Sequence, residues 1–147
     1  MSEHKTTEIL QEEAAKLWAD LESKKSADVK LTPKDRTAIP PQEMPSRDPI
    51  KRAHEMGEVA LGYTETQARV EAERCIQCPG APCKKGCPVA VPIPEFISHI
   101  QKGDFKGAVD TIKQTNLLPA ICGRVCPQEK QCQSFCTVGK MLKTPEK

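Results

Sequence analysis

Eight cysteines lie within residues 75–136 and constrain the fold of this chain more than any other feature of its sequence. The other 85 of its 147 residues contain none. The cysteines form two runs with the spacings Cys75-x2-Cys78-x4-Cys83-x3-Cys87 and Cys122-x3-Cys126-x5-Cys132-x3-Cys136. Only five aromatic residues occur in the chain, so a large apolar core is not expected. We therefore expect bound inorganic groups to organise this half of the molecule.

Three kinds of cysteine site compete for this pattern: disulfides, zinc sites and iron–sulfur clusters. The N-terminus is polar and lacks the apolar segment of a secretory signal, which predicts a cytoplasmic location where thiols stay reduced. Zinc ribbons usually show two C-x2-C knuckles, and this chain has one. The run that ends at Cys87-Pro88 is close to the bacterial-ferredoxin pattern C-x2-C-x2-C-x3-C-P, with two extra residues before its third cysteine. The spacing therefore favours iron–sulfur ligation.

Eight thiolates match the needs of two [4Fe–4S] clusters, because each cube takes four ligands. The direct division gives one run to each cluster. In two-cluster bacterial ferredoxins, however, the cysteine before the proline ligates the other cluster. By that logic Cys87 of the first run ligates the second cluster, and Cys136 of the second run ligates the first. The first cluster then takes Cys75, Cys78, Cys83 and Cys136, and the second takes Cys87, Cys126 and Cys132, with Cys122 as its fourth ligand or as a bystander.

The chain divides by pattern into three parts. Residues 1–30 carry an amphipathic helix over residues 6–25, residues 31–50 form a proline-rich linker, and residues 51–147 form a helical double-cluster domain. The prolines of the linker argue against regular helix there, so we expect it to run extended. No stretch alternates as a strand does, which makes the expected class all-α.

Within the predicted domain, residues 51–62 read as a short helix. Thr64 and Gln67 then fit a capping box, which starts a helix that delivers the first cysteine at its C-terminal end. Residues 94–116 read as a helix–turn–helix that separates the two cysteine runs.

Several classes of function are disfavoured. The net charge of +2 is too small to indicate nucleic acid or an anionic membrane as a partner. No apolar stretch approaches the roughly 18 residues of a membrane span. No side chain stands out as an acid, a base or a nucleophile, so we expect no catalytic residue.

One known family matches these motifs. The stretch RCIQCPGAPCKKGCPVAVPIPEFISHIQKGDFKGAVDTIKQTNLLPAICGRVCPQEKQCQSFCTVGK resembles the N-terminal iron–sulfur region of the glutamate synthase small (beta) subunit. The same region occurs in the flavoprotein subunit of NADH-dependent ferredoxin:NADP oxidoreductase and in dihydropyrimidine dehydrogenase. The preceding MPSRDPIKRAHEMGEVALGYTETQARVEAERC is similar to the lead-in of that family, so the resemblance covers about residues 44–140.

This resemblance implies an all-α, helical-ferredoxin-like fold that holds two [4Fe–4S] clusters. It implies the crossed ligation for seven of the cysteines. The position of Cys122 is not a ligand in the family, where a glutamate or glutamine from a downstream helix completes the second cluster. The chain stops at Lys147, before that helix. The fourth ligand is then Cys122, a solvent molecule or a partner, or the second cluster is lost.

Members of the family continue into domains that bind FAD and NAD(P)H through G-x-G-x-x-G fingerprints, and this chain contains no such fingerprint. The resemblance thus implies an electron-transfer module of an NAD(P)H-dependent flavoprotein oxidoreductase, cut from a longer enzyme. Its clusters would relay electrons between a flavin in the downstream domains and a large or partner subunit. The alternatives are a structural zinc module used for subunit docking, and a metal-free domain with reduced thiols.

Overall fold

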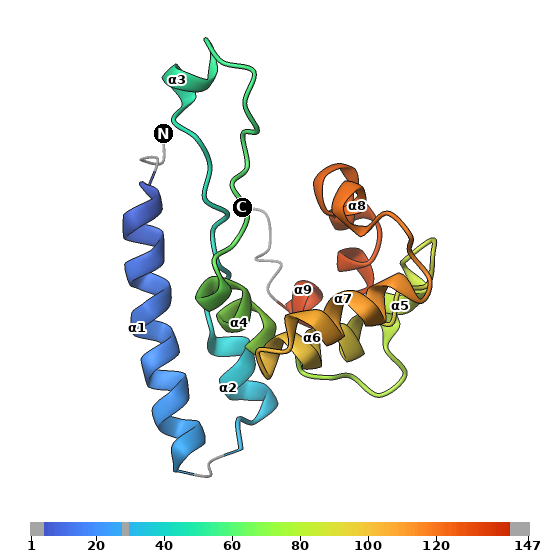
Figure 1. The fold of residues 1–147 in the computed structure, drawn as a ribbon. Helices are drawn as coiled ribbons and strands as arrows, with labels where there is room; N and C mark the ends of the chain where they lie inside the picture. The colour runs from blue at the N-terminus through green and yellow to red at the C-terminus, as the bar shows by residue number, and fades with distance from the viewer. Residues whose placement is uncertain (1–4, 28–29, 142–147) are drawn as a thin grey trace. The chain divides into compact units, whose positions relative to one another are not determined.

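The computed structural model describes residues 5–27 and 30–141, and most of them lie in helices joined by short connections (Figure 1). No strand forms among these residues, and Ser46 and Ala60 make an isolated antiparallel bridge. The expected all-α class is confirmed. The helices are α1 (Thr7–Ser26), α2 (Pro33–Ala38), α3 (Pro49–Arg52), α4 (Glu65–Glu73), α5 (Pro82–Lys85), α6 (Ile93–Gln101), α7 (Phe105–Lys113), α8 (Pro119–Val125) and α9 (Thr137–Met141), with 3-10 turns η1 (Gln128–Lys130) and η2 (Gln133–Phe135).

The chain divides into two compact units, Met1–Glu71 and Ala72–Lys147, and the boundary along the chain falls in the last turn of α4. The cysteines all lie in the second unit. The three-part division at residues 30 and 50 stays a prediction. Among the described residues, no helix is long and apolar enough to cross a membrane.

The first unit has a small core that α1 supplies from one face. Leu10, Ala14 and Leu21 are buried, and they recur at the spacing that places side chains on one side of a helix. Leu21 packs with Ile39 and Val70, so the α1 stripe meets the end of α2 and the middle of α4. The helix predicted for residues 6–25 is confirmed by α1.

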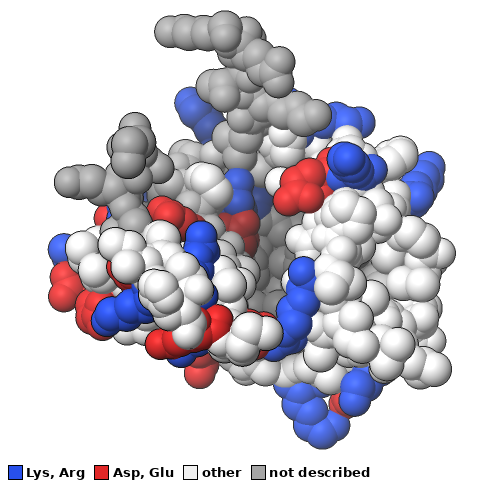
Figure 2. All heavy atoms as spheres, turned by 90° about the horizontal axis from the view of Figure 1, so that it is seen from above, with Lys and Arg blue, Asp and Glu red and all other residues white. Residues whose placement is uncertain are grey.

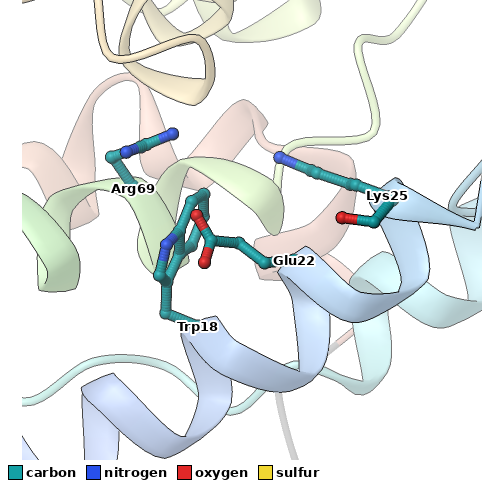
Figure 3. A pocket seen from close by; sticks show the side chains of 5 residues that line it. Trp18, Glu22, Lys25 and Arg69 are labelled. Carbon is teal, nitrogen blue, oxygen red and sulfur yellow. The ribbon is translucent and has the colours of Figure 1, made fainter.

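A stacked aromatic ring links α1 to α4 in this unit. The Arg69 guanidinium lies 4.1 Å from the centroid of the Trp18 ring, and Lys25 Nζ lies 4.9 Å from it. Figure 3 shows the Arg69 side chain reaching from α4 over the Trp18 indole, with Glu22 beside the ring. These side chains and Ser26 line a shallow hollow. Cation–π contacts of this kind help to hold α4, whose far end leads to the first cysteine.

Two local predictions fail in the first unit. The linker was expected to be extended, but α2 begins at Pro33, because proline has the backbone φ and the missing N–H that suit a first helical turn. Thr32 and Asp35 complete its capping box. The helix predicted for residues 51–62 is also wrong, since α3 ends at Arg52.

The chain after α3 forms backbone hydrogen bonds with an earlier segment instead of continuing as a helix. The Arg47 N–H donates to Val59 O at 2.9 Å, and the Leu61 N–H donates to Pro45 O at 2.8 Å. These bonds use backbone groups that a helix over residues 51–62 would have needed for itself.

The capping box predicted for α4 is present. Thr64 Oγ1 accepts from the Gln67 N–H at 3.3 Å, and Gln67 Oε1 accepts from the Thr64 N–H at 3.1 Å. Gln67 is 1% exposed, so the box is also part of the packed interior. The helix it starts ends at Glu73, one residue short of the predicted end at Arg74, and the first cysteine follows it closely as predicted.

The second unit contains the predicted helical hairpin, formed by α6 and α7, which pack side by side (Figure 1). Gly103 takes a positive φ of 77° at the turn. Asp104 caps α7 by accepting from the Gly107 N–H at 2.8 Å, and its other oxygen lies 2.8 Å from His99 Nδ1. The Gly107 N–H, followed by the bond to His99, lowers the pKa of Asp104. The hairpin is fixed to the end of α4 by a bond from Gln101 Nε2 to Ala72 O at 2.8 Å.

Candidate metal centres

The first cysteine run begins in the irregular chain that follows α4. The Cys75 N–H donates to Ala72 O at 3.1 Å, so this cysteine closes the last turn of the helix. In the described part of the chain, the non-glycine residues with positive φ are Gln77, Ala81 and Ala90, at 51°, 40° and 51°. Such conformations cost energy and persist where the surroundings demand them. All three lie within or just after the first run, which places the backbone strain at the cysteines.

The last two cysteines of that run, Cys83 and Cys87, sit in and just after α5. Gly86 stands between them and lies against the second run. A Cβ added to Gly86 would be 2.8 Å from the Gln131 carbonyl oxygen and 3.1 Å from Cys132 Cα. The backbone beside Cys87 therefore approaches the second run as closely as a glycine allows.

The second run is held at the ends of short elements. Cys122 lies in α8, and the Cys126 N–H donates to Cys122 O at 3.1 Å just after that helix ends. Cys132 lies between the turns η1 and η2, and Cys136 precedes α9. Each of the last three cysteines thus lies outside regular helix.

Three sulfurs from both runs come together in what we call the first site. Burial raises the pKa of the Cys83 thiol, and the sulfurs of Cys136 and Cys75 are near enough to raise it further. Cys78 is linked to this group because its Sγ donates to Thr137 Oγ1 at 3.4 Å, and Thr137 follows Cys136 directly. The structure therefore brings Cys136 to the first run. The first site comprises Cys75, Cys78, Cys83 and Cys136.

A second group of sulfurs, which we call the second site, comprises Cys87, Cys126 and Cys132. Burial raises the pKa of the Cys132 thiol, and the sulfurs of Cys87 and Cys126 raise it further. The Cys126 Sγ donates to Gln131 Oε1 at 3.1 Å. Cys87 comes from the first run, so each site contains one cysteine from the opposite run.

Cys122 makes a different contact. Its Sγ lies 3.7 Å from Asn116 Oδ1, a long sulfur hydrogen bond. Asn116 is 8% exposed, and the same oxygen accepts from the Leu118 N–H at 3.0 Å. The Cys122 thiol therefore has a buried acceptor of its own near the start of α8.

None of the eight cysteines forms a disulfide, and all are partly buried. In the ranges that the structure describes, no three His, Cys, Asp or Glu side chains are arranged around a single metal ion. The donor set nevertheless fits iron–sulfur clusters, which take soft thiolate ligands from irregular loops. The two sites would supply seven such ligands.

The charge of the second unit suits an anionic cofactor. Residues 72–147 carry eleven Lys and Arg against six Asp and Glu, a net charge of +5. Lys84 and Lys85 lie in α5 between two of the cysteines, and both are exposed. Thiolate-ligated cubes carry net negative charge, which nearby cations stabilise. On the face drawn in Figure 2, basic side chains occur in small groups with acidic side chains and uncharged surface between them.

Sequence reasoning missed the polar side chains that contact the cysteines. Gln131, Thr137 and Asn116 each bond to a sulfur. Two of them could have been found from the sequence because they are neighbours of cysteines: Gln131 directly precedes Cys132, and Thr137 directly follows Cys136. Nothing in the spacing distinguished Asn116.

A known family matches the same part of the chain. The model of domain II of dihydropyrimidine dehydrogenase, described as a 4Fe-4S cluster domain, matches residues 52–145. The chain belongs to this family. Membership places it among the 4Fe–4S domains of oxidoreductases and confirms the resemblance predicted from the cysteine motifs.

Characterised relatives agree with that assignment. The NAD-dependent dihydropyrimidine dehydrogenase subunit PreT of Escherichia coli is 45% identical over 82 residues, which are 56% of this chain and 20% of the relative. The glutamate synthase [NADPH] small chain of the same organism is 38% identical over 95 residues, or 64% of this chain and 20% of the relative. The small chain from Azospirillum brasilense is 34% identical over 99 residues, or 66% and 20%. The chain thus spans about a fifth of the length of these relatives.

Proposed function

We propose that this chain is an electron-transfer module that holds two [4Fe–4S] clusters and relays electrons within an NAD(P)H-dependent flavoprotein oxidoreductase. The first site would hold one cluster through four cysteines. The second site would hold the other through three. Two contacts between the runs support the proposal: Thr137, next to Cys136, accepts a hydrogen bond from Cys78, and Gly86, next to Cys87, lies against Cys132.

Crossed ligation also accounts for how this small unit is stabilised. The buried apolar residues described between residues 72 and 141 are few, namely Ala72, Val91, Ala108 and Val138. A cluster bound by cysteines from both runs would tie segments about 50 residues apart, which compensates for a small core.

The chain's own residues have distinct tasks in this proposal. The cysteines would hold the irons as thiolates, and metal binding would release their protons. The strained backbone at Gln77, Ala81 and Ala90 shapes the loop around the first run. When bound, each cluster supplies one-electron chemistry. Partial burial of the thiols keeps solvent from much of each site.

Cys122 does not fill the fourth position of the second site in this proposal. The sulfurs that act on Cys132 are those of Cys87 and Cys126, whereas the Cys122 sulfur contacts Asn116 instead. The fourth ligand is then a solvent molecule or a group from a partner. Cys122→Ser should leave the iron content unchanged.

The electrons come from outside this chain. We assign FAD and NAD(P)H to further domains or to a partner subunit, since two relatives are named as NAD-dependent and NADPH-linked enzyme subunits. The chain alone has no catalytic residue in this account. We place it in the cytoplasm, where its eight thiols would stay reduced.

Anaerobic reconstitution with iron and sulfide tests the proposal. Two [4Fe–4S] clusters require eight irons and eight sulfides per chain, with a broad absorbance band near roughly 400 nm. Stoichiometric zinc uptake with no iron uptake would instead support a structural zinc module for subunit docking. A chain that takes up neither metal would contradict both functions.

A further inference from the structure

Two polar side chains contact cysteine sulfurs, one at each site. Gln131 Oε1 lies 3.1 Å from Cys126 Sγ in the second site. Thr137 Oγ1 lies 3.4 Å from Cys78 Sγ in the first site. Each of these two residues is adjacent in the chain to another cysteine of the site that it contacts. Binding of iron by those cysteines would therefore hold both polar side chains in place.

The donor of each hydrogen bond must change when the cysteine becomes a ligand. The thiols of Cys126 and Cys78 now donate to oxygen. A thiolate bound to iron has no proton and can only accept. The Gln131 amide can offer its NH₂ group after a half-turn about its last side-chain bond, and the Thr137 hydroxyl can rotate to donate. Both contacts can thus persist with the direction reversed.

The position of Gln131 fits a hydrogen-bond donor better than an iron ligand. Its amide lies beside the sulfur of Cys126 itself. Ligands of different irons leave different corners of the cube and point apart. An amide in contact with one ligating sulfur is therefore placed to bond to that sulfur, and not to complete the fourth corner.

We propose that Gln131 and Thr137 set the reduction potentials of the two clusters separately, by donating hydrogen bonds to the Cys126 and Cys78 sulfurs. This inference rests on the proposed function. Reduction adds negative charge to a cluster and its sulfurs, so a donor stabilises the reduced form and raises the potential. Gln131 acts only on the second cluster and Thr137 only on the first.

The test is a redox titration of the reconstituted 147-residue chain, followed by the electron paramagnetic resonance signals of the reduced clusters. Gln131→Leu removes the amide at similar size, and Thr137→Val removes the hydroxyl at nearly equal volume. Gln133→Leu is the matched control, because Gln133 lies in the same segment and is exposed. We expect Gln131→Leu to lower one midpoint potential, Thr137→Val to lower the other, and Gln133→Leu to change neither.

The possible outcomes distinguish a failure of this inference from a failure of the proposed function. Unchanged potentials in both variants, with eight irons still bound, would overturn the inference and leave the proposed function standing. Equal shifts of both midpoint potentials in each variant would overturn the claim that each residue acts on one cluster only. A parent chain that binds no iron would overturn both proposals. If Gln131→Leu loses iron, Gln131→Met is measured instead, and the same lowered potential of one cluster is expected.

Discussion

Replacing Gly86 by alanine tests how closely the two cysteine runs pack. Gly86 has a φ of −83°, which alanine adopts without strain, so any cost must come from neighbours. The added Cβ would lie 2.5 Å from Phe135 Cδ2, 2.8 Å from the Gln131 carbonyl oxygen and 3.1 Å from Cys132 Cα. The phenyl ring can rotate away, but the other two atoms belong to the backbone.

The magnitude follows from two opposing terms. Overpacking by one methyl group costs about 1–3 kcal/mol. Alanine also restricts the unfolded chain more than glycine does, and this raises the free energy of unfolding by about 0.4–1 kcal/mol. We therefore expect Gly86→Ala to lower the free energy of unfolding by about 1–2 kcal/mol, the middle of the range of roughly 0–2.6 kcal/mol that the two terms allow. With a urea slope of about 2 kcal/mol per molar, the urea midpoint should fall by about 0.5–1 M.

Gly123→Ala is the matched control. Gly123 lies within α8, and its added Cβ would meet nothing within 4 Å. Alanine there should raise the stability by about 0.4–1 kcal/mol. The assay is anaerobic urea unfolding of the reconstituted chain by far-UV circular dichroism, together with iron content. A midpoint for Gly86→Ala equal to or above that of Gly123→Ala would refute the close packing of the two runs.

Three further predictions concern single side chains. Cys87→Ser should lose the irons of the second site, whereas Cys122→Ser should keep the iron count of the parent chain; equal losses, measured by iron analysis, would contradict the assignment. Thr64→Ala should cost about 1 kcal/mol of stability through the lost helix cap, whereas Thr6→Ala should cost little because Thr6 makes no side-chain cap bond. Asp104→Ala should be less stable than the parent at neutral pH. Because the folded pKa of Asp104 lies below its ordinary 3.8, that difference should shrink as the pH falls below 3.8 and vanish beneath the lowered pKa, as acid titration of the urea midpoint would show.

The features that the sequence predicted are those that local chemistry decides. The α6–α7 hairpin follows from Gly103 at the turn and Asp104 as a cap, both of which act within four residues. The Thr64–Gln67 capping box is equally local. The cysteine spacing carried the metal chemistry because each kind of cluster needs its ligands at characteristic intervals.

The features that were missed depend on segments far apart in the chain. Residues 51–62 have the composition of a helix, but backbone bonds to residues 45–47 compete with it. The contact of Cys78 with Thr137 spans 59 residues and depends on how both side chains are oriented. The prolines of residues 31–50 predict an extended segment because proline breaks helices, but Pro33 stands in the first turn of a helix and starts α2.

The central claim is that cysteines of the two runs exchange places between two clusters. A crystal structure of the reconstituted chain, with the irons located by anomalous scattering, tests it most directly. The account predicts Cys136 on the cluster held by Cys75, Cys78 and Cys83, and Cys87 on the cluster held by Cys126 and Cys132. Two clusters that are each bound by a single run, Cys75–Cys87 and Cys122–Cys136, would contradict it.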